Sequence, residues 1–180
     1  MAIPQYLKEV ETFQINREPH HAVFSQKCEK ELNEGWLLSY FNDALLIKDD
    51  FFNDEELKSN MKKVRVPLSL ELQGYGKPMY VNQTYPWSAS EQIIPGEIPH
   101  DNQVGSYVRY ILLDHEQLNE RVHIRFHGVE SAFALWINGT FVGYSEDSFT
   151  PSTFDISEFV VEGMNKIAVQ VYRFSSGSWL

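Results

Sequence analysis

The stretch that decides the fold is LWINGTFVGYSEDSFTPSTFDIS, residues 135–157. Its Asn138-Gly139 pair is a strong signal for a two-residue β-hairpin turn, because a type I′ turn needs positive φ at both central residues and Asn and Gly tolerate that conformation. The apolar runs on either side of the turn predict antiparallel strands over 135–137 and 140–144.

The side chains of this hairpin divide between two faces. With a two-residue loop, Trp136 lies opposite Phe141 and both project from one face. Leu135 is then expected opposite Val142, and together with Ile137 these residues make the other face apolar as well. A strand pair without a polar face belongs inside a layered structure, so we expect a sandwich whose outer side is covered by more of the chain or by another domain.

Further short runs rich in β-branched and aromatic residues surround this hairpin. They are separated by the turn-like segments DHEQLNE and VEGMN, at the spacing of an antiparallel β-sandwich. The expected strands of this half are SYVRYILL, RVHIRFHG, AFALWI, TFVGYS and KIAVQVYRF, at 106–113, 121–128, 132–137, 140–145 and 166–174.

The first half of the chain is less regular. It contains one expected strand, Leu32–Phe41, and the segment NDEELKSNMKK, in which Asn53 or Asp54 would cap a short helix with acids first and lysines last. Residues 68–102 form a long loop-rich connection, which favours a functional role or packing against a partner. Residues 1–31 are expected to form an extended N-terminal arm, and 32–180 one β-sandwich domain.

Composition limits the classes of function. The chain has 180 residues, enough for one full core, and a formal net charge of −10 that disfavours nucleic acid and anionic membranes as partners. Cys28 is the single cysteine and cannot form an internal disulfide. No secretion signal or membrane-length apolar segment is apparent, so a cytoplasmic location is expected.

The histidines and carboxylates do not predict a catalytic or metal site. His123 and His127 are four residues apart, which on a strand separates their Cα atoms by about 13 Å, too far for one zinc ion. Adjacent acids such as Glu146-Asp147 seldom face each other across a substrate as glycosidase carboxylates do, and a solvated loop is the favoured interpretation. The sequence therefore predicts no metal ligand in this chain.

The second half of the chain resembles a known family. RVHIRFHGVESAFALWINGTFVGYSEDSFTPSTFDISEFVVEGMNKIAVQVYRFSSGSWL, preceded by LQGYGKPMYVNQTYPW and GSYVRY, is similar to the N-terminal sugar-binding domain of bacterial β-galactosidases of glycoside hydrolase family 2. The resemblance extends from about Leu32 to the last residue. The β-glucuronidases are the related enzymes that must be distinguished from the β-galactosidases. Their corresponding hairpin typically continues with a Gly-Gly-Tyr type stretch, whereas this chain reads GYSEDSFTPSTFDIS, which favours the β-galactosidases.

The resemblance implies a jelly-roll fold and a place within a longer enzyme. In the family, immunoglobulin-like domains and a TIM barrel follow this domain, and two glutamates on the barrel catalyse retaining hydrolysis of β-galactosides such as lactose. Mg²⁺ and Na⁺ are implied for that full-length enzyme and no cofactor for this chain. We therefore expect no catalytic residue here and no activity of the chain alone. The family members continue after GSWL with an acidic EDQD segment.

One substrate contact is also implied. In the family, an asparagine in the loop before the GSY strand hydrogen-bonds a galactose hydroxyl, and this position corresponds to Asn102 in HDNQVGSY. The family loop more often reads Asn-Pro-Thr-Gly, whereas Gln103 and Val104 stand here. An amide suits a sugar hydroxyl because it donates and accepts, and as a loop residue Asn102 is expected to have no role in the core.

Several alternatives remain at this stage. Trp136 is expected in the core because it lies mid-strand, while Trp87 and Trp179 could each stack on a sugar. A stand-alone carbohydrate-binding module on the same fold is an alternative to an enzyme segment. The resemblance also implies that the N-terminal arm holds subunits of a homo-oligomer together, and in the isolated chain we expect the arm to be mobile or to borrow a neighbour. Its apolar residues are Ile3, Tyr6, Leu7, Phe13, Ile15, Val23 and Phe24.

Overall fold

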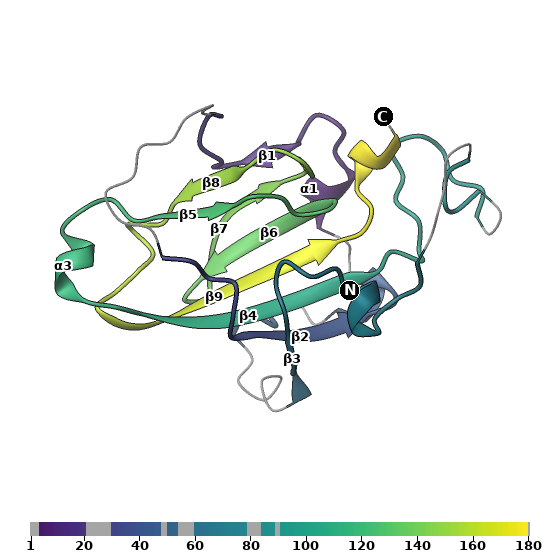
Figure 1. The fold of residues 1–180 in the computed structure, drawn as a ribbon. Helices are drawn as coiled ribbons and strands as arrows, with labels where there is room; N and C mark the ends of the chain where they lie inside the picture. The colour runs from purple at the N-terminus through teal and green to yellow at the C-terminus, as the bar shows by residue number, and fades with distance from the viewer. Residues whose placement is uncertain are drawn as a thin grey trace.

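The computed structural model describes residues 4–20, 30–47, 50–53, 60–78, 84–88 and 91–179. An antiparallel seven-stranded sheet, in the order β1-β7-β6-β9-β4-β2-β3, faces a two-stranded sheet of β5 and β8 (Figure 1). The strands are β1 Gln14–Ile15, β2 Trp36–Phe41, β3 Lys62–Val64, β4 Val104–Leu113, β5 His123–Phe126, β6 Ala132–Ile137, β7 Thr140–Ser145, β8 Ser152–Asp155 and β9 Gly163–Tyr172. The helical segments are α1 Gln5–Lys8, α3 His115–Leu118 and the 3-10 turns η1 Ala44–Leu46, η2 Glu71–Gln73 and η3 Ser176–Trp179. The predicted sandwich of jelly-roll type is confirmed.

The hairpin of β6 and β7 forms where the sequence predicts it. Asn138 and Gly139 have φ values of 51° and 82°, as the turn requires. The Asn138 side chain also joins the turn to its surroundings: its Nδ2 donates to the Phe159 carbonyl at 2.9 Å, and its Oδ1 accepts from the Lys166 N–H at 2.9 Å. The turn is therefore stabilised by its backbone conformation and by side-chain hydrogen bonds.

The predicted register of this hairpin is wrong beyond its second pair. Leu135 pairs with Gly143 instead of Val142, because a β-bulge lies between the pairs of Leu135 and Trp136. The bulge changes the alternation of side chains, so Tyr144 projects from the outer face, where its hydroxyl donates to Glu146 Oε1 at 2.6 Å. In the regular register the same hydroxyl would lie in the apolar core between the sheets, where it would cost free energy without a partner.

Two apolar clusters lie on the two faces of the large sheet. The inner cluster lies between the sheets and joins Leu135, Val142 and the β8 residue Phe154. The outer cluster contains Trp136, which is 8% exposed, so its assignment to the core is confirmed. The sequence predicted that this face is covered either by more of the chain or by another domain, and here the chain itself covers it. The covering residues are Leu7, Ala44, Ile47, Phe51 and Ile98.

The described part of the N-terminal arm is docked on its own domain. Leu7 is fully buried, and the ring of Tyr6 lies 4.6 Å from that of Tyr144. The short strand β1 pairs with β7, and the Phe13 carbonyl accepts from the Glu146 N–H at 3.0 Å. Residues 4–20 are therefore docked through Tyr6 and Leu7, whereas Val10 and Phe13 remain more than half exposed. Ile3, Val23 and Phe24 lie outside the described residues.

Two local predictions are changed by the structure. The expected strand from Leu32 begins only at Trp36, whose indole Nε1 donates to the Leu32 carbonyl at 2.6 Å and so folds the preceding residues back. The short helix α3 is missed, although Asp114 and Gln117 form the capping box that its sequence allows. The helix expected to begin at Asn53 or Asp54 falls mostly on residues 54–59, outside the described part.

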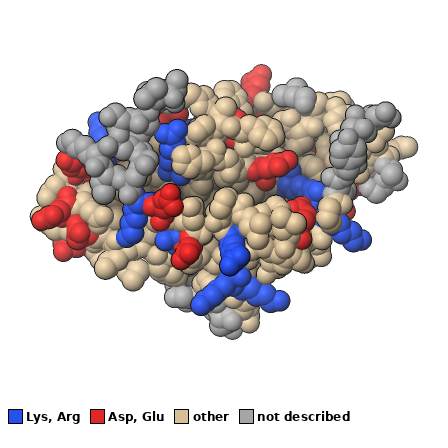
Figure 2. Space-filling model, viewed as in Figure 1, with Lys and Arg blue, Asp and Glu red and all other residues tan. Residues whose placement is uncertain are grey.

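The surface carries charges of both signs. In Figure 2 acidic and basic side chains are interspersed on the face shown, without a broad basic patch there. Among the described residues, no helix is both long and apolar enough to cross a membrane.

Candidate functional site

The position implied for substrate binding lies at one end of the large sheet, where β4 begins and β9 ends. Val104 and Tyr172 are the last paired residues of these strands. The ladder continues one step further, because the Arg173 N–H donates to the Gln103 carbonyl at 3.0 Å. This end of the sheet holds Asn102 and the C-terminal residues 173–179 close together.

Asn102 is fully buried and takes part in this ladder through its side chain. Its Oδ1 accepts from the Phe174 N–H at 2.9 Å, and its Nδ2 donates to the Phe174 carbonyl at 2.8 Å. The amide thus replaces a backbone strand partner for Phe174. The expectation that Asn102 has no role in the core is wrong, because backbone groups that lie beyond the last strand pair still need hydrogen-bond partners and the buried Asn102 supplies them. Its contact with a sugar stays a prediction.

The neighbouring loop residue is also held in place. The Gln103 side-chain oxygen accepts from Arg173 Nη1 at 2.7 Å, and the same Arg173 nitrogen lies 3.8 Å from Glu71 Oε1. The Arg173 guanidinium stands 5.7 Å from the centre of the Phe174 ring. Gln103 and Val104, which depart from the usual family loop, therefore fit this chain through a polar contact at Gln103 and a fully buried side chain at Val104.

Three aromatic side chains gather beside Phe174. Together with Phe174 they form what we call the aromatic cluster: Tyr85, Trp87, Phe174 and Trp179. Trp87 is 5% exposed and lies 5.1 Å from the Phe174 ring and 5.0 Å from Trp179. Tyr85 stacks on Trp87 at 5.1 Å and donates its hydroxyl to the Trp179 carbonyl at 2.9 Å. Burial in this cluster removes Trp87 from the surface, whereas Trp179 and Tyr85 keep partial exposure.

Glu146 binds the other side of the C-terminal turn. Burial raises the pKa of its carboxyl, while hydrogen bonds from Tyr144, Ser175, Ser176 and the Gly177 backbone act in the opposite direction. A Cβ on Gly177 would lie 2.6 Å from Glu146 Oε2, so the turn passes directly over the carboxylate. The prediction of a solvated loop at Glu146 is wrong, because the bulge in β7 directs Tyr144 and Glu146 toward the C-terminal turn.

The adjacent acid has a different environment. Its carboxylate Oδ2 lies 3.6 Å from Arg17 Nη1, so Asp147 contacts the N-terminal arm. Burial by itself would raise its pKa, but hydrogen bonds from Thr150 and Phe149 together with the Arg17 charge lower it. The two acids therefore bind separate segments and do not form a facing carboxylate pair. The other acid pairs of the sequence include residues outside the described ranges.

The chemistry offered at this end of the sheet is binding and positioning. Amide, carboxylate and aromatic groups hold residues 173–179 against the loop of Asn102. Sequence reasoning found Asn102, Trp87 and Trp179 but not the roles of Glu146 and Phe174. Tyr144 and Glu146 are two residues apart and therefore share a face of the strand, but which face this is depends on the bulge, which the sequence does not reveal.

Comparison with known proteins places the chain in a family. The sequence model described as "Glycosyl hydrolases family 2, sugar binding domain" matches residues 29–180. A β-galactosidase of Streptococcus thermophilus is 44% identical over 155 residues, which cover 86% of this chain and 15% of that protein. A β-galactosidase of Lactobacillus delbrueckii subsp. bulgaricus is 41% identical over 97% of this chain and 18% of its own length.

Solved structures agree on the fold. A β-glucuronidase from Ruminococcus gnavus superposes with a TM-score of 0.58 at 17% identity, over 83% of this chain and 23% of that one. A β-glucuronidase from an uncultured Clostridium sp. gives a TM-score of 0.55 at 19% identity, over 84% and 24% of the two chains. Identities this low show the shared fold alone. The chain spans 15% to 19% of the first three curated relatives it matches. The chain belongs to glycosyl hydrolases family 2, through the sugar-binding domain of that family.

Proposed function

We propose that this chain serves as the N-terminal sugar-binding and assembly domain of a retaining β-galactosidase that hydrolyses terminal β-D-galactosides such as lactose. The observation that carries the proposal is an identity of 41% to 44% with proteins named β-galactosidase, over 86% to 97% of the chain. The glucuronidase alternative has weaker support, because those structures share 16% to 19% identity wherever their TM-score reaches 0.5.

The role we propose for the site is to position the segment that follows residue 179 in longer relatives. Asn102 and Trp87 contact Phe174, Tyr85 binds the Trp179 carbonyl, and Glu146 lies against Gly177, so residues 173–179 are held at several points. A segment held this firmly leaves the domain in a defined direction, as a segment that completes a substrate pocket must. The domain would then contribute to catalysis by positioning and would supply no acid or nucleophile.

We retain the contact between Asn102 and a galactose hydroxyl as a proposal for the longer enzyme. Asn102 Nδ2 uses one of its two N–H groups, and Oδ1 one of its two lone pairs, in hydrogen bonds to Phe174. The second N–H and the second lone pair are the groups that would bind a sugar hydroxyl. The side chain is 0% exposed in this chain, so the contact also requires the loop of 101–103 to turn toward the pocket. Mg²⁺ and Na⁺ remain expectations for the longer enzyme, and a cytoplasmic location is likewise a proposal.

Assembly through the N-terminal arm is the remaining part of the proposal. Val10 and Phe13 are 54% and 55% exposed on the docked arm and could meet another subunit. Exposed apolar side chains beside a docked strand favour such a contact. A stand-alone carbohydrate-binding module is the second candidate, and the partial exposure of Tyr85 and Trp179 is the feature that favours it.

The test is a comparison of three proteins on chromogenic galactosides and glucuronides. They are this chain, the product of its parent reading frame, and a chimera in which this chain replaces the matched residues of the Streptococcus thermophilus β-galactosidase. We expect no turnover by the chain, since both catalytic carboxyls belong to the barrel, and galactoside hydrolysis by the other two. Galactose binding by the chain alone should be weak, because one hydrogen bond contributes only about 0.5–1.5 kcal/mol.

The outcomes separate the alternatives. Turnover by the purified chain, free of host enzyme, would contradict the proposed division of labour. A chimera that folds but is inactive, with a parent product that cleaves only glucuronides, would favour the glucuronidase. Tight galactoside binding by the chain alone would favour the stand-alone module.

A further inference from the structure

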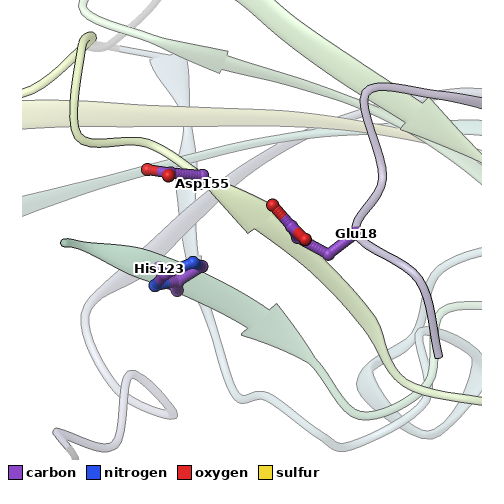
Figure 3. A group of neighbouring side chains, drawn as sticks. All are labelled: Glu18, His123 and Asp155. Carbon is purple, nitrogen blue, oxygen red and sulfur yellow. The ribbon is translucent and has the colours of Figure 1, made fainter. Parts of the chain in front are cut away.

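Three extended segments bring Glu18, His123 and Asp155 together on the outer face of the small sheet (Figure 3). His123 is the first residue of β5 and lies directly opposite Asp155, the last residue of β8. Their neighbours Ile124 and Phe154 are buried between the sheets, so His123 and Asp155 project outward by alternation.

Glu18 joins this pair from the arm. Its backbone N–H donates to the Thr153 carbonyl at 2.8 Å, which lays the arm along the free edge of β8. The three side chains thus stand on neighbouring extended segments and converge on one place. Ligand atoms of all three residues lie within 4.8 Å of one another. In Figure 3 the Glu18 and Asp155 carboxylates and the His123 ring surround a common space.

From this convergence we propose that Glu18, His123 and Asp155 form a binding site for a divalent transition-metal cation of the zinc type. One imidazole nitrogen and two carboxylate oxygens are a ligand set that zinc accepts, with water completing a four-coordinate shell. Bonds of about 2.0–2.2 Å place the ligand atoms of a tetrahedral zinc about 3.3–3.6 Å apart. The exposed His123 and the half-buried Glu18 can close the remaining distance by side-chain rotation.

The surroundings of the site support ligation by Asp155. Its Oδ1 accepts from the Ser157 N–H at 2.9 Å and from the Ser157 hydroxyl at 2.6 Å, which orients the carboxylate and leaves Oδ2 for a metal. Two carboxylates this close repel each other, and a bound cation removes that repulsion.

The imidazole decides between kinds of metal. Mg²⁺ and Ca²⁺ prefer oxygen ligands, and Ca²⁺ takes six to eight of them, whereas His nitrogen suits zinc and its neighbours. We therefore expect Zn²⁺ to bind at least about tenfold more tightly than Mg²⁺. The competing arrangement is an ion pair of His123 with Asp155, to which the nearby Arg121 adds its charge. Such an ion pair needs no metal, and a titration with zinc distinguishes it from a metal site because only the metal site binds zinc saturably.

The experiment is a calorimetric titration of the chain with ZnCl₂ and with MgCl₂, paired with thermal melting. The test variants are His123→Gln, Glu18→Gln and Asp155→Asn, of which the last retains an oxygen for Ser157. The controls are His127→Gln, a histidine just beyond the same strand, and Cys28→Ser, which removes the thiol as a ligand. We expect one saturable zinc site, weakened at least about tenfold by each test variant and changed less than about twofold by the controls.

Two results would overturn the proposal. One is the lack of saturable zinc binding by the unaltered chain. The other is binding that all three test variants retain within about twofold, or that disappears only with Cys28→Ser. If Asp155→Asn does not fold, as its melting without metal will reveal, His123→Gln decides, because the His123 side chain is exposed.

Discussion

Both atoms of the Asn102 side-chain amide are hydrogen-bonded to the backbone of Phe174, at 2.8 and 2.9 Å. A loop side chain therefore completes the hydrogen bonding of the segment that follows β9. Asn102 therefore has a structural role toward Phe174, and any contact with a galactose hydroxyl must be made by the hydrogen-bonding positions that this role leaves.

The first prediction concerns the stability of Asn102→Ala. The substitution removes both hydrogen bonds and leaves the Phe174 N–H and carbonyl without these partners, so the free energy of unfolding should fall by about 2–4 kcal/mol. Chemical denaturation of the chain measures this change. Asn119→Ala is the matched control, since Asn119 is exposed at the end of α3. An unchanged stability of Asn102→Ala would show that the two bonds contribute nothing.

The second prediction concerns Asn102→Ala in the parent enzyme. If the amide also binds a galactose hydroxyl that it holds more tightly in the transition state, kcat/KM of the folded enzyme should fall by about ten- to a thousandfold. Gln103→Ala is a less suitable control than its place in the loop suggests, because Gln103 binds Arg173. Asn119→Ala serves again. Unchanged kinetics together with reduced stability would assign Asn102 a structural role alone.

The third prediction uses the opposite pKa shifts of two neighbouring acids. The pKa of Glu146 is raised above its ordinary value of 4.5 in the folded chain, so its contribution to stability is greatest at low pH and is lost as the pH rises through the folded pKa. Glu146→Gln removes this loss, so its stability relative to the unaltered chain should improve from pH 4.5 upward. Denaturation curves between pH 4 and about pH 8 measure the trend.

Asp147→Asn is the matched comparison. The pKa of Asp147 is lowered below 3.8, so its contribution is present above that value and is lost as the pH falls through the folded pKa. The stability deficit of Asp147→Asn should therefore shrink as the pH falls below 3.8, opposite in sign to the trend for Glu146→Gln, and denaturation curves for this variant must extend below pH 3.8. Parallel pH profiles for the two variants would contradict both assignments.

The fourth prediction tests the docking of the N-terminal arm. Leu7, within α1, is fully buried, whereas Val10, two residues after the end of α1, is 54% exposed. Leu7→Ala should cost about 2–5 kcal/mol and expose the arm to limited proteolysis, whereas Val10→Ala should leave both properties nearly unchanged. Equal cleavage of the arm in the unaltered chain and in Leu7→Ala would show that the arm is not held by this contact.

A fifth prediction separates the two functions of Asn138. Asn138→Gly keeps the positive φ but loses the hydrogen bonds to Phe159, Asn165 and Lys166, and it should destabilise the chain by about 1–3 kcal/mol. Asn138→Ala adds the steric cost of a left-handed backbone, about 1 kcal/mol more. Thermal melting of both variants gives the two terms. Equal stability of the two variants would contradict the turn assignment.

The sequence by itself determined the elements whose causes are local. The Asn138-Gly139 turn follows from the φ values that these residues tolerate, and AFALWI and TFVGYS become β6 and β7 without a change of boundary. The apolar side chains of this hairpin also lie on the expected faces, because a strand alternates with a period of two. These properties depend on residues within a few positions of each other.

Only the tertiary structure decided where distant residues meet. The bulge that pairs Leu135 with Gly143 directs Tyr144 and Glu146 toward the C-terminal turn, and no local pattern announces it. Asn102 meets Phe174 because β4 and β9 are neighbours in the sheet, and Glu18 meets Asp155 because the arm follows the edge of β8. Hydrogen-bond partners and ligand sets of this kind depend on strand order and register, which many separate contacts determine together.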